Sequence, residues 1–261
     1  YVPVKSRNPM GFRGRCAVYI FSIPAMAAAF KQSFVTDTYK YPPRFWANCW
    51  YMCQPRRQGR GAQPHLDSRD IIKMIEVFEK KEENAMEITQ GVDFGSFGLS
   101  EATLRAIRNK GYTVSTPVQA GCIPPMMAGR DVIAKAPTGT GKTMAFGIPI
   151  IEKIDPDSEE VQAVIMAPTR ELAMQITDEM RDIAVYHEGV RLVCLYGGQP
   201  IGKQINALKR KPQIVVATPG RLSDHMKRRT VNLKSVQTVV LDEADRMLDM
   251  GFIHDVTRIL D

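Results

Sequence analysis

The sequence has 261 residues, enough for one large domain or two small ones, and 44% of them are apolar, as in proteins that bury a core. This composition excludes a disordered tail. The formal net charge of +7 is concentrated near the start, because residues 1–66 hold ten Lys and Arg against a single acid, Asp37. The remainder is close to neutral, so a polyanion site there must be a local patch.

The five cysteines are odd in number and show no paired metal-ligand spacing, which favours a reducing, cytoplasmic protein over a disulfide framework. Cys49 and Cys53 are spaced as two metal ligands would be, but no second Cys/His pair follows them. Ordinary residues are therefore the favoured interpretation. The four histidines, His65, His187, His225 and His254, also lack ligand spacing, and we expect them to be structural or exposed.

Residues 1–85 show little regular periodicity. The run GRCAVYIFSIPAMAAAF combines basic residues, apolar residues and an Ala-x-Ala pattern, as a secretory signal does, but it is short for a membrane span and not at the N-terminus. Only SRDIIKMIEVFEKKEE has an amphipathic helical pattern, with Ser68 as its N-cap. We expect residues 1–85 to be a mostly irregular extension and predict no membrane association.

From residue 91 onward, apolar β-branched runs alternate with helix-like segments. The predicted strands are 131–136, 163–168, 191–196, 213–218 and 238–243, and the helices between them begin near Lys142, Arg170, Pro200, Gly220 and Ala244. Strand starts 22 to 32 residues apart suit βαβ units with right-handed crossovers. The pattern predicts an α/β fold, a doubly wound parallel sheet with helices on both faces, whose ligands bind beyond the carboxyl ends of the strands.

The first predicted strand runs into APTGTGKT, residues 136–143. Its glycines let backbone N–H groups turn toward phosphate oxygens, Lys142 reaches the β- and γ-phosphates, and Thr143 is placed to hold Mg²⁺ at a helix N-terminus. The usual phosphate-loop pattern begins with Gly, whereas this one begins with Ala136. The predicted nucleotide-binding residues of this loop are Thr138, Gly139, Thr140, Gly141, Lys142 and Thr143.

Three acids follow the last predicted strand, in the string VVLDEADRML. An unpaired buried carboxylate is costly, so the acids should emerge at an edge where a cation meets them. Asp242 is placed to hold the Mg²⁺ of a nucleotide bound beside Lys142. Glu243 is placed to position or deprotonate an attacking water. We therefore predict Glu243, Asp242 and Lys142 as the catalytic residues.

Over residues 94–261 the chain resembles the N-terminal, RecA-like core domain of bacterial DEAD-box RNA helicases, named after the string that here is Asp242-Glu243-Ala244-Asp245. GYTVSTPVQ resembles the family's adenine-reading motif. The resemblance implies that Gln119 bonds the base edge, with Thr116 beside it, and that Phe94 stacks on adenine, although a core role beside Phe97 is the alternative. Ser115 stands where the family usually has Pro.

The strings PTRELA, Gly-Gly and TPGR resemble family motifs that grip the RNA backbone. The resemblance implies RNA contacts from Pro168, Thr169, Arg170, Gly197, Gly198, Thr218, Pro219, Gly220 and Arg221. It also implies interdomain coupling through Asp245. Phosphate contacts carry little sequence information, so we expect sequence-independent, salt-sensitive binding. Without the motif, Arg221 would be interpreted as a solvated surface charge. We interpret Lys227 to Arg229 as the solvated end of a helix.

The resemblance implies ATP and Mg²⁺ as cofactors and RNA as partner. It also implies a fold incomplete at the C-terminus, because a second helicase domain with arginine fingers lies outside the sequence and residues 86–261 form a truncated first domain. Without those arginines we expect feeble hydrolysis. The alternatives are a nucleotide-dependent RNA clamp, an inactive truncated module, or a different phosphate-loop ATPase that remodels protein.

We further expect native translation to begin at Met86. The resemblance starts just after it, and residues 86–261 carry 21 basic and 21 acidic side chains, so the charge imbalance belongs to the leader. KEENAM can also be encoded with a bacterial ribosome-binding sequence ahead of the ATG. The rival explanation is a genuine basic extension that tethers RNA.

Overall fold

The computed structural model describes residues 16–22, 50–52 and 91–260, with only the backbone in the first two ranges. Our expectations for Cys49, Cys53, His65, the helix beginning at Ser68, and Met86 fall outside these residues.

The described part of the chain forms a seven-stranded sheet in the order β2-β3-β1-β7-β4-β6-β5. The five strands predicted after residue 91 are confirmed, each within two residues at either end. All adjacent pairs are parallel except β2 and β3. The strand bounds are β1 Cys16–Ser22, β2 Trp50–Met52, β3 Val132–Ala136, β4 Ala163–Met166, β5 Leu192–Leu195, β6 Ile214–Ala217 and β7 Thr238–Asp242.

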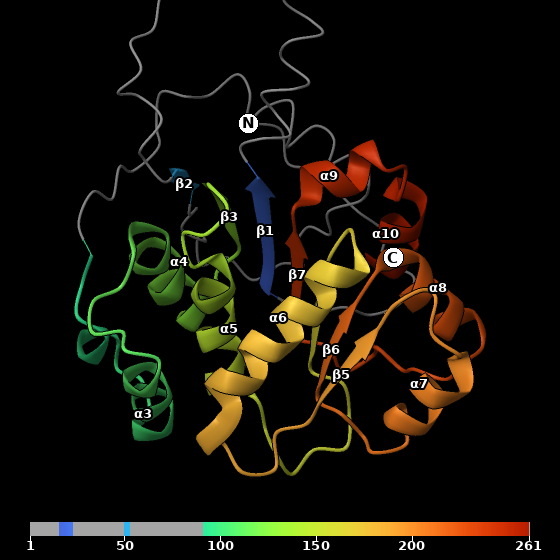
Figure 1. The fold of residues 1–261 in the computed structure, drawn as a ribbon, viewed down its shortest axis with the longest axis horizontal. Coiled ribbons are helices and arrows are strands. Elements are labelled where there is room, and N and C mark those ends of the chain that lie inside the picture. The colour runs from blue at the N-terminus through green and yellow to red at the C-terminus, as the bar shows by residue number, and fades with distance from the viewer. Residues whose placement is uncertain (1–15, 23–49, 53–90, 261) are drawn as a thin grey trace, which may run out of the picture.

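Strand β1 is the first in the chain but lies in the interior of the sheet, between β3 and β7 (Figure 1). Val18 is in register with Val132 on one side and Val240 on the other. We expected a mostly irregular extension in residues 1–85, with no strand, so this pairing is an unforeseen feature. The division of the chain at residue 86 stays a prediction.

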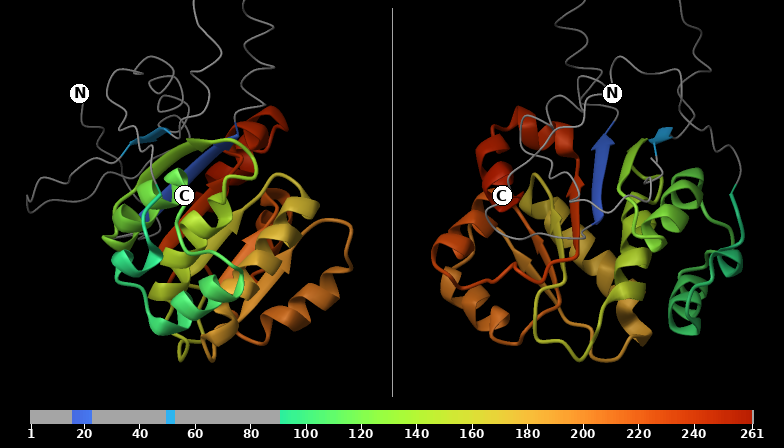
Figure 2. Two further views of the ribbon diagram at one scale, coloured as in Figure 1. Left: turned by 60° about the vertical axis from the view of Figure 1, so that its left-hand side comes forward. Right: turned by 180° about the vertical axis from the view of Figure 1, so that it is seen from behind.

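Helices cover both faces of the sheet (Figures 1 and 2), as the fold prediction requires. Helices α3 to α6 share one hydrophobic core with the sheet, and α7 to α10 share the other. The α-helix bounds are α3 Glu101–Asn109, α4 Pro117–Met127, α5 Lys142–Lys153, α6 Arg170–Ile183, α7 Ile201–Leu208, α8 Pro219–Lys227, α9 Ala244–Asp249 and α10 Ile253–Leu260. There are also two short 3-10 helices, η3 Phe94–Phe97 and η4 Ala184–Tyr186. Both contribute to the core that α3 to α6 share with the sheet.

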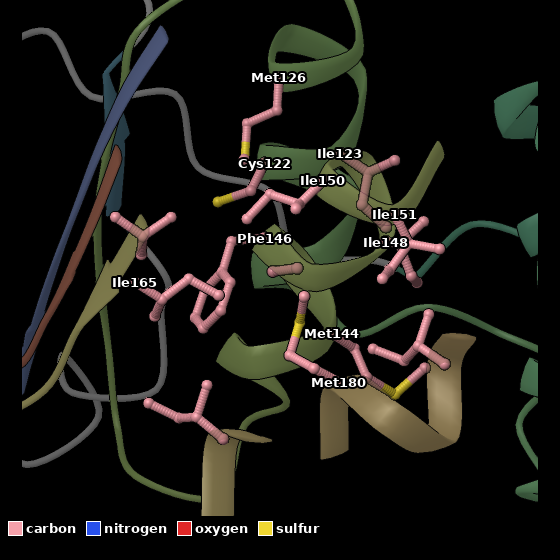
Figure 3. Packing of buried hydrophobic residues seen from close by; sticks show 14 of the residues in the cluster. Cys122, Ile123, Met126, Met144, Phe146, Ile148, Ile150, Ile151, Ile165 and Met180 are labelled. Atoms are coloured by element: carbon pink, nitrogen blue, oxygen red, sulfur yellow. The ribbon is translucent and has the colours of Figure 1, made fainter. Parts of the chain in front are cut away.

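The two cores follow from the alternation of side chains along each strand. In β4, Ile165 packs in the core with α5 and α6, while its neighbours Val164 and Met166 pack in the core with α7 to α10. Figure 3 shows Cys122, Phe146 and Ile165 converging between the helices and the sheet. Strands β4 and β6 are apolar throughout because every residue in them is buried, which is typical of parallel sheets.

The carboxyl ends of the parallel strands lie along one edge of the sheet. Met166 is in register with Leu241 and Ala217, and Ala217 with Leu195, so the loops after β4, β5, β6 and β7 leave the sheet side by side. Within the described residues, no helix has the length and apolar character that a membrane crossing requires.

Candidate functional site

The loop between β3 and α5 has the geometry of a phosphate site. Gly139 and Gly141 have φ values of +83° and +84°, which favour glycine, and the hydroxyl of Thr140 donates to the carbonyl of Pro137 at 2.8 Å. Gly141 is the N-cap of α5 and offers no side-chain acceptor to the first turn. The first N–H groups of a twelve-residue helix therefore face the loop, as anion binding requires.

Lys142 and Asp242 meet at the edge of the sheet. Lys142 is 8% exposed and its ammonium donates to the carbonyl of Ala136 at 3.3 Å. Asp242 is 3% exposed, and burial raises its pKa to about 6, opposed by the charge of Lys142 and reinforced by that of Glu243. The positive charge of Lys142 therefore acts on Asp242, and the Mg²⁺ that we expected there stays a prediction. Thr143 lies half-buried in the first turn of α5.

Glu243 has a strained backbone, with φ +51° and ψ +49° in the left-handed region. Its N–H donates to Oδ1 of Asp242 at 3.0 Å, and its side-chain Oε2 accepts from Nη1 of Arg246 at 3.1 Å. Arg246 was not among the predicted site residues. Its position three residues after Glu243, at the start of a predicted helix, could have indicated the contact, because side chains at that spacing are neighbours. Asp245 is half-buried on the same helix.

Gln119 links helix α4 to the phosphate loop. With Thr116 it forms a capping box, in which the Gln119 side chain accepts from the Thr116 N–H at 2.9 Å. Its amide nitrogen donates to the carbonyl of Gly141 at 3.1 Å. A Cβ at Gly141 would lie 2.4 Å from that nitrogen, so the contact also requires glycine.

Phe94 is 3% exposed and packs edge-on against Phe97, with ring centroids 6.0 Å apart. In this structure it is a core aromatic, as the alternative interpretation has it. Stacking on adenine stays a prediction, and it requires a face of the ring to open.

Ser115 explains how this chain departs from the family pattern. Its hydroxyl accepts from the Val92 N–H at 2.9 Å and donates to the Val92 carbonyl at 2.8 Å. Its own N–H also donates to that carbonyl at 2.8 Å. Proline has no N–H and no hydroxyl, so it could form none of these three bonds. They hold the segment that carries Phe94 against the segment that carries Gln119.

The predicted RNA-contacting residues gather at the same edge of the sheet. Thr169 caps α6, and its hydroxyl accepts from the Leu172 N–H at 3.3 Å. Arg170 is exposed beside Glu171, whose hydrogen bond and charge raise the arginine pKa. A guanidinium nitrogen of Arg170 lies 3.7 Å from where a Cβ of Gly198 would be. Gly197 and Gly198 are exposed, Thr218 and Gly220 half-buried, and Pro168 and Pro219 buried.

Arg221 is not a solvated surface charge. It is half-buried, and its Nη1 donates to the Gln199 carbonyl at 3.0 Å and to Oε1 of Gln204 at 3.1 Å. Gln204 contacts both Arg221 and the buried His225, and no motif indicated either Gln204 or His225, because these contacts are tertiary. Lys227 to Arg229 are exposed at the end of α8, as predicted, and Arg228 pairs with Asp224.

Residues 116–261 match the family profile described as DEAD/DEAH box helicase. The chain belongs to this family. It is 53% identical over 169 residues to the DEAD-box ATP-dependent RNA helicase CshA of Bacillus licheniformis, which covers 65% of this chain and 34% of that protein. The ATP-dependent RNA helicase CshA of Listeria monocytogenes is 52% identical over 167 residues, covering 64% of this chain and 32% of that protein.

A solved DEAD box protein from the hyperthermophile Methanococcus jannaschii shares the fold, with a TM-score of 0.60 and 41% identity over 65% of this chain and 46% of that one. The doubly wound α/β architecture of this DEAD-box chain is thus confirmed. The chain spans about a third of the length of the curated relatives, 34% for the protein from Bacillus licheniformis.

Proposed function

We propose that the chain is the first core domain of an ATP-dependent RNA helicase, with residues 86–261 as its RecA-like unit and a cytoplasmic location. One observation carries the proposal. The phosphate loop, the Asp242–Glu243 pair and the predicted RNA-contacting loops all lie at the carboxyl edge of one sheet. ATP and RNA bound there would share a single rigid support, which a coupled enzyme needs.

ATP binding is assigned to the phosphate loop and the capping box. The ammonium of Lys142 donates to the carbonyl of Ala136 in this structure. With ATP bound, it would donate to the β- and γ-phosphates instead. Gln119 has two of its four hydrogen-bonding positions engaged by Thr116 and Gly141, which leaves one N–H and one lone pair for a base edge. That pairing of donor and acceptor suits adenine.

Thr143 and Asp242 would hold Mg²⁺, and the residues fit this ion. A hydroxyl in the first turn of α5 and a buried carboxylate are oxygen donors, the type that Mg²⁺ prefers. When bound, Mg²⁺ neutralises charge on the phosphates. Glu243 would orient or deprotonate the attacking water, and its carboxylate accepts a hydrogen bond from Arg246.

RNA binding is assigned to Thr169, Arg170, the Gly197–Gly198 loop and Arg221, with sequence-independent contacts to phosphate and sugar. Unwinding requires a second core domain, which we propose for the longer protein with Asp245 coupling the two domains. The alternatives are a nucleotide-dependent RNA clamp and an inactive module.

RNA-stimulated turnover distinguishes these possibilities. We would measure ATP hydrolysis by the longer protein, with and without single-stranded RNA. The proposal predicts that RNA raises kcat and that Glu243→Gln abolishes turnover in both conditions. Hydrolysis that is absent or insensitive to RNA would favour the clamp or the inactive module.

A further inference from the structure

The buried side chain of Gln204 uses its complete hydrogen-bonding capacity. Gln204 is 2% exposed on α7. Its Nε2 donates to the Tyr196 carbonyl and to Oε1 of Gln199, both at 2.9 Å. Its Oε1 accepts from Nη1 of Arg221 at 3.1 Å and contacts Nε2 of His225 at 3.0 Å. A carboxamide has two donors and two acceptor positions, so none is left over.

The partners determine the orientation of this amide. A guanidinium only donates, so the atom of Gln204 that faces Arg221 must be the oxygen. Nε2 of His225 must then carry a hydrogen toward the same oxygen. His225 is 0% exposed, and its Nδ1 lies 2.8 Å from the hydroxyl of Thr230. The oxygen of Gln204 is therefore held by two donors, the half-buried Arg221 and the buried His225.

The four contacts join two segments that are separate in sequence. Tyr196 and Gln199 flank the exposed Gly197–Gly198 loop after β5, whereas Arg221 and His225 lie on α8 after β6. Arg221 also donates directly to the Gln199 carbonyl at 3.0 Å. Arg221 is thus tied to the glycine loop by this direct bond and through the amide of Gln204.

We propose that Gln204 is a positioning residue for RNA binding, which locks the Gly197–Gly198 loop and Arg221 into one unit that contacts the RNA backbone. This inference rests on the proposed function. Both hydrogens of the Arg221 Nη1 are directed inward, to Gln199 and Gln204. Nε and Nη2 have no hydrogen-bond partner among residues 91–260, and they form the edge of the guanidinium that meets a phosphate. Gln204 acts through Arg221 and does not touch RNA.

Gln213 provides a matched control. It is also a buried glutamine, 0% exposed, and its Nε2 donates to the carbonyls of Pro156 and Ser158, both at 2.9 Å. It precedes β6, at the opposite end of the strand from Arg221. Gln213→Leu and Gln204→Leu therefore remove the same buried amide, but only Gln204→Leu removes it beside the predicted RNA contacts.

The test is fluorescence anisotropy of a labelled single-stranded oligouridylate with the full chain, across a salt series. Gln204→Leu and Arg221→Ala should each weaken binding about tenfold, and the double variant should bind no more weakly than Arg221→Ala alone. Each single variant should reduce the steepness of log K against log salt by about 0.7, because one phosphate contact is lost. Gln213→Leu should stay within about twofold of the unaltered chain.

ATP affinity reports whether Gln204→Leu folds, since the phosphate loop is on another strand. If Gln204→Leu loses ATP binding, Gln204→Glu is tested in its place. A glutamate keeps the acceptor for Arg221 but removes the donors to Tyr196 and Gln199. We expect it to lose the same RNA affinity. Normal RNA binding by a folded Gln204 variant, with Arg221→Ala impaired, would overturn the inference and leave the proposed function standing. An unaltered chain that fails to bind RNA would overturn the proposed RNA contacts themselves.

Discussion

Lys142 and Glu243 lie close to Asp242 but should act at different stages of turnover. Lys142→Ala should weaken ATP binding by about 10- to 100-fold, because it removes a charged donor to the phosphates. Glu243→Gln should retain ATP affinity and abolish hydrolysis, because the carboxylate is needed only in the reaction. ATP titration and turnover assays of the longer protein would test both. Normal hydrolysis by Glu243→Gln would exclude Glu243 as the base.

The buried His225 should make stability depend on pH. Burial, aided by Arg221 and Arg228 and opposed by Asp224, lowers its pKa below the ordinary value of 6.5. The unfolded chain therefore binds a proton at His225 at a higher pH than the folded chain does. The stability that His225 contributes is complete above pH 6.5 and is lost as the pH falls from there through the lower pKa of the folded state. We would measure the free energy of unfolding in urea between pH 7.5 and 5.5. As the pH falls, this free energy should decrease less steeply for His225→Asn than for the unaltered chain, by up to about 1.4 kcal/mol per pH unit.

The exposed His254 provides the control for this measurement. His254→Asn should follow the pH profile of the unaltered chain. If His225→Asn also follows it, His225 does not contribute the proposed linkage.

At the scale of single residues, the sequence predicted those whose roles follow from their place after a strand. Lys142 and Asp242 meet because parallel strands align their carboxyl ends. Gln204 could not be found this way, since its partner Arg221 lies 17 residues further along the chain. The burial of Phe94 against Phe97 likewise depends on how η3 packs. Ser115 could be recognised as a departure from the family, but its bonds to Val92 could not.

Helices α5 and α6 approach closely at Gly147. A Cβ there would lie 2.7 Å from the sulfur of Met180 and 3.0 Å from Cδ1 of Ile183. Gly147→Val should lower the free energy of unfolding by about 1 to 3 kcal/mol through overpacking. Gly202, on α7, has nothing within 4 Å of its Cβ position, so Gly202→Val should have a much smaller effect. Equal effects in urea unfolding would contradict the close crossing of α5 and α6.

At the scale of elements, hydrophobic pattern and turn chemistry predicted five strands and the helices that follow them. Three of those strands, β4, β6 and β7, are buried along their whole length, so their apolar runs stand out in the sequence. Strand β1 escaped prediction because its apolar run resembles a signal sequence, and only its register with β3 and β7 gives it a role in the sheet. A local pattern does not specify a partner that lies more than a hundred residues away.

For the whole molecule, the position of β1 makes a shortened chain informative. Five residues of β1 pair with β3 and five with β7. A chain of residues 86–261 should therefore be less stable than the full chain, by more than about 2 kcal/mol, because both strands lose a hydrogen-bonded neighbour. Urea unfolding of the two chains would measure this. Equal stability would contradict the pairing of β1 and would favour translation from Met86.

A titration of the full chain with ATP and with GTP in the presence of Mg²⁺ tests the proposed nucleotide site directly. Adenine recognition by Gln119, joined to the phosphate loop through Gly141, predicts tighter binding of ATP than of GTP. Gln119→Ala should reduce that preference by about tenfold, since a buried donor and acceptor are removed. Equal affinity for ATP and GTP in the unaltered chain would contradict the assigned nucleotide site.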